Sequence, residues 1–111
     1  MASSYIGEFE QMVLLAVLQR GDEAHAIDVR EELERCADRS VSRGALYRTF
    51  DRLQAKGYVE WELEASSPVP ERGGHPMRHF RVTEAGLGAL RASRTALLKL
   101  WDGIDAVLDK R

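Results

Sequence analysis

The spacing of hydrophobic and polar positions predicts two helices in the first third of the chain. Residues 7–20 carry apolar side chains at too many positions for a single stripe, so this helix is expected to be buried on more than one side. Residues 26–37 instead divide into an apolar face and an acidic face. The apolar face consists of Ala26, Val29, Leu33, Cys36 and Ala37, and the solvent face of Asp28, Glu31, Glu32 and Glu34. The pattern therefore predicts a central helix followed by an amphipathic helix.

A third helix is predicted after the polar segment at residues 38–42. Ser42 is a suitable N-cap because its hydroxyl can accept a hydrogen bond from a free backbone N–H. Leu46, Phe50 and Leu53 recur at helical spacing and form the inward stripe. The outward face carries Gly44, Tyr47, Arg48, Asp51 and Ala55. Two helices joined by so short a turn are typical of a helix-turn-helix.

A pair of strands is predicted after the third helix. Residues 58–65 alternate between apolar and acidic side chains, which is the period of a half-buried strand. Its inward positions are Val59, Trp61 and Leu63. Residues 66–77 hold all the prolines and the pair Gly73-Gly74, so they are expected to form the connecting loop, and residues 78–82 alternate again as the returning strand. A helix-turn-helix followed by such a hairpin is the layout of a winged helix-turn-helix, an α+β fold that is mainly α.

The C-terminal segment is predicted to form one long helix that pairs with a second copy of the chain. Thr83 supplies an N-cap and Glu84 a first-turn acid. The positions that follow step alternately by three and four residues and are apolar with one exception, which is the pattern of a coiled-coil seam. They are Leu87, Leu90, Arg94, Leu97, Trp101, Ile104 and Leu108. A helix of about 25 residues would project beyond a domain of this size. We therefore expect a winged helix-turn-helix domain at residues 1–83 and a dimerisation helix at residues 84–111.

Charge is distributed unevenly along the chain. The formal net charge of -2 argues against a nucleic-acid partner, since phosphate contacts need cations. Residues 39–57, however, hold five basic residues and one acidic residue, and residues 66–83 hold three and one. Residues 22–38 hold seven acidic residues and two arginines. A basic face on an otherwise acidic protein can dock on a duplex in one orientation.

Composition and residue spacing argue against several other classes. An apolar content of 44% with 31% charged residues is typical of one globular domain. No signal peptide and no apolar run long enough to span a bilayer are present, so a cytoplasmic location without membrane association is expected. Cys36 is expected to pack as a small hydrophobe. The histidines lack metal-ligand spacing, and no nucleophile, base or phosphate-binding loop is evident. We expect no metal, no cofactor and no enzymatic activity.

Four motifs carry a resemblance to a known family. They are Gly7-Glu8-Phe9-Glu10, Gly44-Ala45-Leu46-Tyr47, the segment from Arg52 to Gly57, and the segment from Val82 to Gly86. In order and spacing, residues 7 to about 90 resemble the PadR-like transcriptional regulators. The resemblance implies a dimeric winged-helix repressor of its own and nearby genes. In some members a small aromatic or drug-like compound releases the repressor from DNA.

Candidate DNA-binding residues follow from position and from the resemblance. Arginine can donate two hydrogen bonds to a guanine edge or a phosphate, and the tyrosine hydroxyl can donate to a phosphate. The third helix and the basic segments indicate Arg39, Arg43, Tyr47, Arg48, Arg52 and Arg72. The resemblance implies contacts by Ser42, Arg43, Tyr47 and Arg48 on the helix and by Gly73, Gly74 and Arg78 on the wing. His75-Pro76-Met77 stands where many members carry a basic run, so the resemblance is weakest at the wing tip.

The seam of the last helix supplies the candidate dimer and ligand residues. Those expected to pack against a second copy are Leu90, Leu97, Trp101, Ile104 and Leu108. Trp101 has two interpretations: it packs in the dimer, or it forms with Asp102 one wall of a ligand cavity between subunits. Trp61, by contrast, is expected in the core.

The sequence therefore predicts a homodimeric, DNA-binding transcriptional regulator, most simply a repressor. Its partner would be a pseudo-palindromic double-stranded operator with half-sites roughly 34 Å apart. The alternative is a winged-helix dimerisation or protein-interaction module without DNA binding, which the acidic total charge and the interrupted wing favour. Salt dependence separates the two, because a protein that binds phosphates loses affinity steeply as salt rises.

Overall fold

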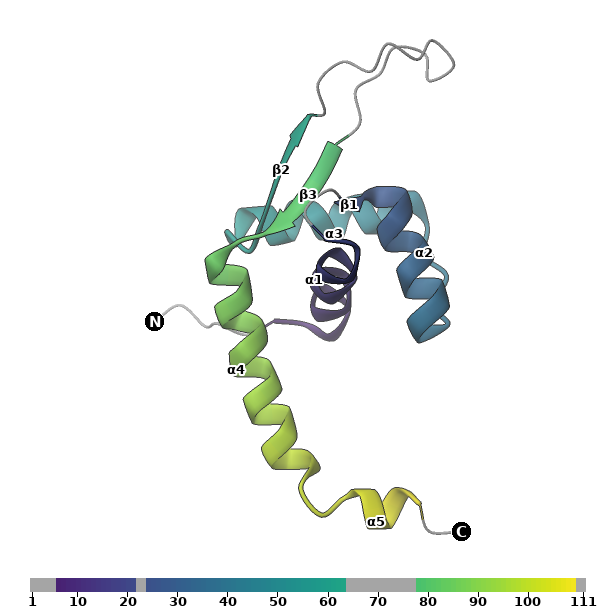
Figure 1. Cartoon of the computed structure of the whole chain (residues 1–111), viewed down its shortest axis with the longest axis vertical. Helices are drawn as coiled ribbons and strands as arrows, with labels where there is room; N and C mark the ends of the chain where they lie inside the picture. The colour runs from purple at the N-terminus through teal and green to yellow at the C-terminus, as the bar shows by residue number, and fades with distance from the viewer. Residues whose placement is uncertain (1–5, 22–23, 64–77, 110–111) are drawn as a thin grey trace.

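Five helices and three short strands make up the described part of the chain, which in this computed structural model is residues 6–21, 24–63 and 78–109. The helices are α1 (Glu8–Arg20), α2 (Ala26–Ala37), α3 (Arg43–Ala55), α4 (Glu84–Trp101) and α5 (Asp105–Leu108), and the strands are β1 (Ala24–His25), β2 (Val59–Leu63) and β3 (Arg78–Val82). In Figure 1, α1 lies in the middle of the molecule between α2 and α4, and α4 leads away toward the C-terminus. The loop predicted at residues 66–77 lies outside the described residues.

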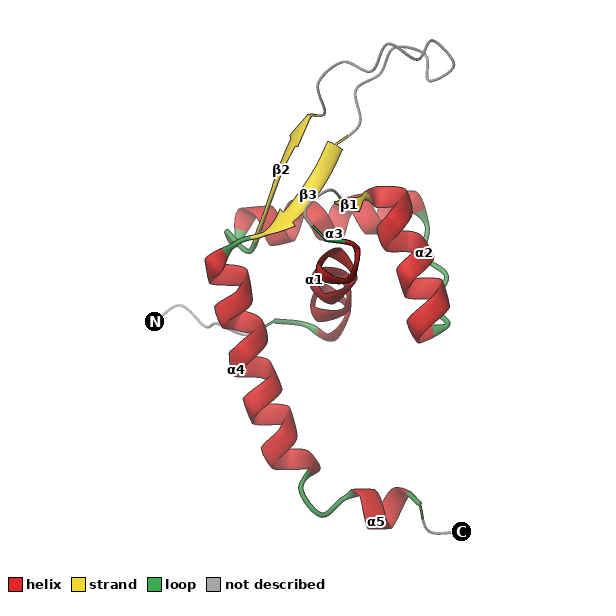
Figure 2. Ribbon diagram, viewed as in Figure 1, coloured by secondary structure: helices red, strands yellow, loops and turns green. Residues whose placement is uncertain are grey.

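The described strands form one antiparallel sheet in the order β1-β3-β2 (Figure 2). The two predicted strands, β2 and β3, pair with Trp61 opposite Phe80. β1 was not predicted, because two residues are too few to show a strand period; it pairs with the other edge of β3, with Ala24 opposite Phe80. Trp61 packs against the core as predicted. The inward placement of Leu63 is wrong, because this end of β2 extends beyond the helices. The winged-helix layout is confirmed.

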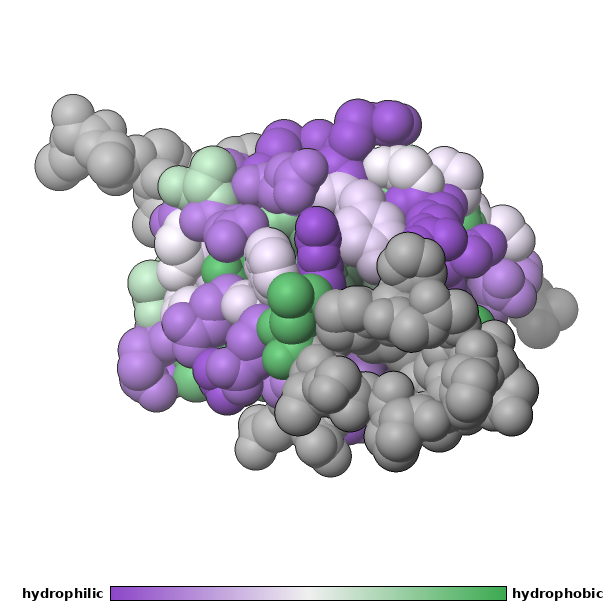
Figure 3. Space-filling view, turned by 90° about the horizontal axis from the view of Figure 1, so that it is seen from above, coloured by the Kyte–Doolittle hydropathy of each residue, from purple (hydrophilic) through white to green (hydrophobic). Residues whose placement is uncertain are grey.

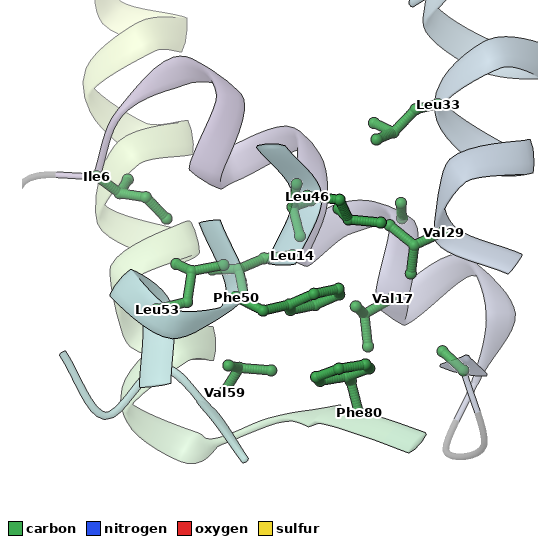
Figure 4. Close-up of a cluster of buried hydrophobic side chains, with 13 residues drawn as sticks. Ile6, Leu14, Val17, Val29, Leu33, Leu46, Phe50, Leu53, Val59 and Phe80 are labelled. Carbon is green, nitrogen blue, oxygen red and sulfur yellow. The ribbon is translucent and has the colours of Figure 1, made fainter. Parts of the chain in front are cut away.

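The core is centred on two stacked phenylalanine rings. Phe50 of α3 and Phe80 of β3 lie nearly parallel, with ring centroids 3.7 Å apart. Leu14 and Val17 of α1 belong to the same buried cluster (Figure 4). The predicted inward stripe of α3 is confirmed at Leu46, Phe50 and Leu53. The stack therefore joins α3 to the sheet over the central helix.

Local capping signals place the helix ends where the sequence predicts them. The Ser42 hydroxyl accepts from the backbone N–H of Ala45 across 3.1 Å at the start of α3. The Thr83 hydroxyl accepts from the N–H of Gly86 across 3.0 Å at the start of α4. α1 ends at Arg20, and its C-cap is Gly21, whose φ of 84° is a conformation that glycine adopts without strain.

The last turn of α2 differs from the prediction. Cys36 and Ala37 are exposed, whereas Glu32, expected in solvent, is buried. The reason is that Arg20 of α1 and Arg35 donate to the Glu32 carboxylate across 2.8 and 2.7 Å, so the buried charge is paired. The Cys36 thiol also donates to Glu32, and this hydrogen bond raises the pKa of Cys36. The prediction of Cys36 as a packed hydrophobe is therefore wrong.

The C-terminal helix is shorter than predicted. α4 ends at Trp101, and residues 102–104 form a turn in which Gly103 has a φ of 80°. Glycine adopts this conformation without the strain that a side chain would add. The apolar pattern therefore continues past Gly103, but the helix does not. The prediction of one continuous helix is therefore wrong at residues 102–104, and the short helix α5 follows this turn. Ile104 and Leu108 do not extend the seam of α4 in register.

Gly86→Ala is expected to destabilise the fold, because α4 approaches the backbone before β2 at this position. A Cβ here would overlap the Tyr58 carbonyl oxygen and come within 2.8 Å of a Val82 methyl. Such overpacking costs about 1–3 kcal/mol. Gly88→Ala adds a carbon with nothing within 4 Å and should stabilise the helix by roughly 0.5–1 kcal/mol. Thermal unfolding checks both, and equal melting temperatures would contradict the close approach at Gly86.

Candidate nucleic-acid interface

The first two turns of α3 carry three of the predicted contact residues. Arg43 and Arg48 are exposed, and neither forms an ion pair with another described residue. Tyr47 is half-buried rather than fully outward, because its ring packs edge-on against Phe50 and Phe80, with centroids 6.3 and 6.4 Å away. This end of α3 therefore presents two exposed guanidinium groups beside a tyrosine anchored in the core.

Arginine and aromatic side chains join α3 to the sheet in one cluster. The Arg78 guanidinium of β3 lies 4.3 Å from the Trp61 ring centroid and 5.6 Å from that of Tyr47. The Arg43 guanidinium lies 5.6 Å from the same tyrosine ring. Contacts over aromatic faces hold a guanidinium in place and leave its in-plane N–H groups able to donate. Arg43, Tyr47, Trp61 and Arg78 together are the basic-aromatic cluster.

Trp61 is a site candidate that the sequence pattern did not indicate. It was predicted only as a core residue, yet its Nε1–H donates to Gln54 of α3 across 3.0 Å and its face carries Arg78. The contact depends on strand register: Trp61 lies opposite Phe80, and Arg78 projects from the same face of β3 two residues away. Alternation alone places both residues on one face but does not pair the strands.

Other predicted DNA contacts are engaged within the chain. The Arg39 guanidinium lies 4.9 Å from the Phe9 ring centroid. The Ser42 hydroxyl caps α3, and Arg52 Nε lies 3.7 Å from a carboxylate oxygen of Glu10. Each of these three therefore has a partner within the chain. The wing candidates outside the described residues are Arg72, Gly73 and Gly74.

Glu10 is a buried carboxylate within the apolar helix α1. Lys56 Nζ donates to its two oxygens across 2.8 and 3.0 Å, and the Gly7 backbone N–H donates across 3.0 Å. Burial raises the pKa of Glu10, but the hydrogen bonds from Lys56 and Gly7 and the charges of Lys56 and Arg52 outweigh burial, so the pKa lies below its ordinary value of 4.5. The ionised carboxylate of Glu10 stabilises the fold at pH values above its ordinary pKa of 4.5, and this stabilisation is lost as pH falls through the lowered pKa. The sequence carried a signal for the contact between Glu10 and Lys56, because Glu10 is an acidic residue in a mostly apolar helix, but the sequence analysis did not use it.

The opposite face of the sheet is more acidic. Arg81 Nε lies 3.2 Å from a Glu60 oxygen and Arg81 Nη1 lies 3.8 Å from Glu62, so this arginine is neutralised by its neighbours on β2. Arg78 therefore remains the arginine that the described sheet offers on the side of α3. Figure 3 looks onto the molecule from above and shows hydrophilic residues over most of the face that the grey atoms leave visible.

The predicted dimer and ligand residues separate into different environments. Leu90 is partly buried against the core of its own chain. The exposed members are Leu97, Trp101, Ile104 and Leu108. A groove of about 560 Å³ lies between the start of α1 and α4, and Trp101 lines it. Asp102 lines a different hollow with Lys99, so Trp101 and Asp102 do not share one cavity.

The described histidines do not form a metal centre. His25 and His79 lie opposite each other on β1 and β3, with ring centroids 6.2 Å apart. No group of three or more His, Cys, Asp or Glu residues in the described ranges is placed to hold a metal ion. Among the helices described, none is long and apolar enough to cross a membrane.

Several solved structures share this fold. A PadR-like transcriptional regulator from Bacillus cereus has a TM-score of 0.71 at 21% identity, covering 93% of each chain. A PadR family transcriptional regulator from Eggerthella lenta has a TM-score of 0.67 at 23% identity, covering 94% of this chain and 88% of that chain. F93 from STIV, a winged-helix DNA-binding protein, has a TM-score of 0.64 at 19% identity, covering 86% of this chain and 94% of that chain.

The sequence profile of the transcriptional regulator PadR-like family matches residues 14–92. No sequence among the curated proteins matches this chain. The matched range begins within α1, contains α2, α3 and the described sheet, and ends within α4. It also contains three of the four sequence motifs in full, and it covers more than half of the chain. The chain therefore belongs to the PadR-like family of transcriptional regulators.

Proposed function

We propose that this transcriptional regulator is a DNA-binding repressor that acts as a homodimer on a pseudo-palindromic operator. The observation that carries the proposal is the basic-aromatic cluster, which fixes Arg43 and Arg78 around Tyr47 at the exposed start of α3. In winged helix-turn-helix proteins the third helix enters the major groove and the hairpin lies beside it. The cluster occupies the junction of those two elements. F93 from STIV, which shares this fold, is a winged-helix DNA-binding protein.

The residues of α3 divide between reading bases and fixing position. Arg43 and Arg48 are exposed and have N–H groups that match the acceptors of guanine in the major groove. Tyr47 is anchored in the core, so its hydroxyl suits a phosphate at a fixed position. Arg78 extends the basic surface from α3 onto β3, where the hairpin would follow the backbone of the duplex. Ser42, Arg39 and the wing residues remain proposed contacts to phosphate.

The proposed dimer rests on the exposed apolar residues of α4 and α5. Leu97, Leu98, Leu100 and Trp101 are all at least 40% exposed, which is more apolar surface than a helix normally leaves in water. A second copy would cover it and set two α3 helices roughly 34 Å apart, one turn of the duplex. We further propose that a small aromatic effector binds in the groove lined by Trp101 and changes that spacing.

Selection of binding sites from a pool of random duplexes tests the proposal. A DNA-reading dimer should enrich a two-fold symmetric motif whose half-sites are about 10 base pairs apart. Binding to the enriched motif should weaken steeply with salt. Failure to enrich any motif would favour the alternative, a protein-interaction module without DNA binding. The observation that supports this alternative is that Arg39 and Arg52, two of the predicted DNA contacts, are ion-paired within the chain.

Arg48→Ala is expected to lower affinity for the enriched motif by about 5- to 150-fold, because a bidentate arginine contact to a base contributes about 1–3 kcal/mol. The side chain is exposed and forms no ion pair with another described residue, so the fold and the dimer should not change. Fluorescence anisotropy measures the affinity, and sedimentation measures the oligomer. Unchanged affinity would remove Arg48 from the reading surface.

A further inference from the structure

Arg48, Arg52 and Lys56 form one continuous basic row along α3 and just beyond its end. Positions four residues apart lie one above the other on a helix, so the row runs from the proposed reading surface to the C-terminal end of α3, where Lys56 is the C-cap. The Arg52 and Lys56 side chains remain 56% and 39% exposed. They differ from Arg48 in being ion-paired. A docked duplex would meet this row along the edge of the groove, where a protein contacts phosphates.

Glu10 is the residue that pairs the far half of this row. Only 6% of Glu10 is exposed, and its two oxygens accept from Lys56 Nζ across 2.8 and 3.0 Å. Arg52 Nε lies 3.7 Å from the second oxygen. A buried carboxylate cannot give up its cations without being left uncompensated in a poorly solvating environment. Phosphates on DNA would therefore have to compete with a partner that the fold holds in place.

We propose that Glu10 withholds Arg52 and Lys56 from DNA phosphates and so limits sequence-independent binding. The inference rests on the proposed DNA-binding function and deepens it by assigning a specificity-determining role to a residue outside the contact surface. Phosphate contacts add affinity for every sequence, whereas base contacts distinguish sequences. If Arg52 and Lys56 do not contact DNA phosphates, affinity for random DNA is lower. Base contacts from the start of α3 then determine which sequence the protein binds. Glu10 is thus a positioning residue that acts through Arg52 and Lys56.

The first test is Glu10→Gln in the full chain, with a random-sequence duplex as the probe. Glutamine keeps the shape of the side chain and can still accept from Gly7, but it does not neutralise two cations. Affinity for the random duplex should rise, and the slope of log K against log salt should steepen by about 1–2, since each phosphate contact contributes about 0.9. If Glu10 acted only in folding, Glu10→Gln would lower the affinity for the random duplex, because a loosened α3 weakens binding.

Glu34→Gln is the matched control for the change of charge. Glu34 is exposed on α2 and forms no ion pair with another described residue, and its replacement removes the same single negative charge. Its salt slope should equal that of the wild type. Adding Arg52→Met and Lys56→Met to Glu10→Gln should return the slope to the wild-type value.

Lys56→Gln keeps the inference testable if Glu10→Gln does not fold. A withheld Lys56 contributes no phosphate contact, so this variant should keep the wild-type slope, whereas loss of about 0.9 would overturn the inference. An unchanged slope or weaker binding in folded Glu10→Gln would overturn it as well and leave the proposed function standing. If neither the wild type nor Glu10→Gln binds any duplex at low salt, the proposed function fails and the inference fails with it.

Discussion

Phe80→Ala is expected to remove about 3–5 kcal/mol from the free energy of unfolding, the usual cost of truncating a buried phenylalanine. Phe80 is fully buried, and its ring stacks on that of Phe50 with centroids 3.7 Å apart. The Phe80 ring is therefore the contact that joins β3 to α3. Small domains are stable by only about 5–15 kcal/mol, and the variant would therefore be marginally folded. Urea or thermal unfolding measures the loss. DNA affinity should fall too, because Tyr47 packs against the same ring.

Ile27→Ala is the control for the loss of a large hydrophobic side chain. Ile27 is 56% exposed on α2, and its truncation should change stability by no more than about 0.5 kcal/mol. The stability of Phe80→Leu should lie between that of Phe80→Ala and that of Ile27→Ala, since leucine fills part of the space but cannot stack on Phe50. If Phe80→Ala were no less stable than Ile27→Ala, the aromatic stack would not be what joins the sheet to α3.

Trp101→Glu is expected to lower affinity for a two-half-site operator by about 100- to 10,000-fold, the range over which joining two binding modules raises affinity. Trp101 is 47% exposed at the end of α4, so a carboxylate there should leave the protomer folded. In the proposed dimer it would place a charge in the apolar seam of each subunit, where it would lack a partner. Sedimentation should report monomers, and anisotropy should report the loss of affinity.

Ala85→Glu provides the matched control, because it adds the same charge to α4 at an exposed position in its first turn, outside both hollows and the exposed apolar residues. It should remain dimeric and bind DNA as the wild type does, apart from the small repulsion of one exposed carboxylate. Dimers of Trp101→Glu with wild-type affinity would place the subunit contact elsewhere on the surface.

The predictions that the structure confirms rest on local signals. Ser42 and Thr83 mark helix starts because a hydroxyl can satisfy a free backbone N–H within three residues, which requires no knowledge of the fold. The inward stripe of α3 is equally local, since helical spacing alone puts Leu46, Phe50 and Leu53 on one face. The winged-helix order followed from these elements and from the alternation in β2 and β3.

The features that escaped prediction depend on residues distant in sequence. Glu32 is buried because Arg20 reaches it from another helix, and Glu10 because Lys56 does. Neither partner follows from periodicity, which sorts charged residues to the surface. The cation–π contact between Arg78 and Trp61 needs the register of β2 and β3, which is set by pairing across the sheet. The end of α4 was missed because a seam pattern does not show whether a glycine within it ends the helix.

The most direct test of DNA reading by this regulator is fluorescence anisotropy of the full chain with DNA from upstream of its own gene and with a shuffled duplex, each at two salt concentrations. We expect tighter binding to the upstream sequence, with affinity for both duplexes falling as salt rises. Equal affinity for the two sequences, or binding that does not respond to salt, would contradict the assignment of α3 and the basic-aromatic cluster as a sequence-reading surface.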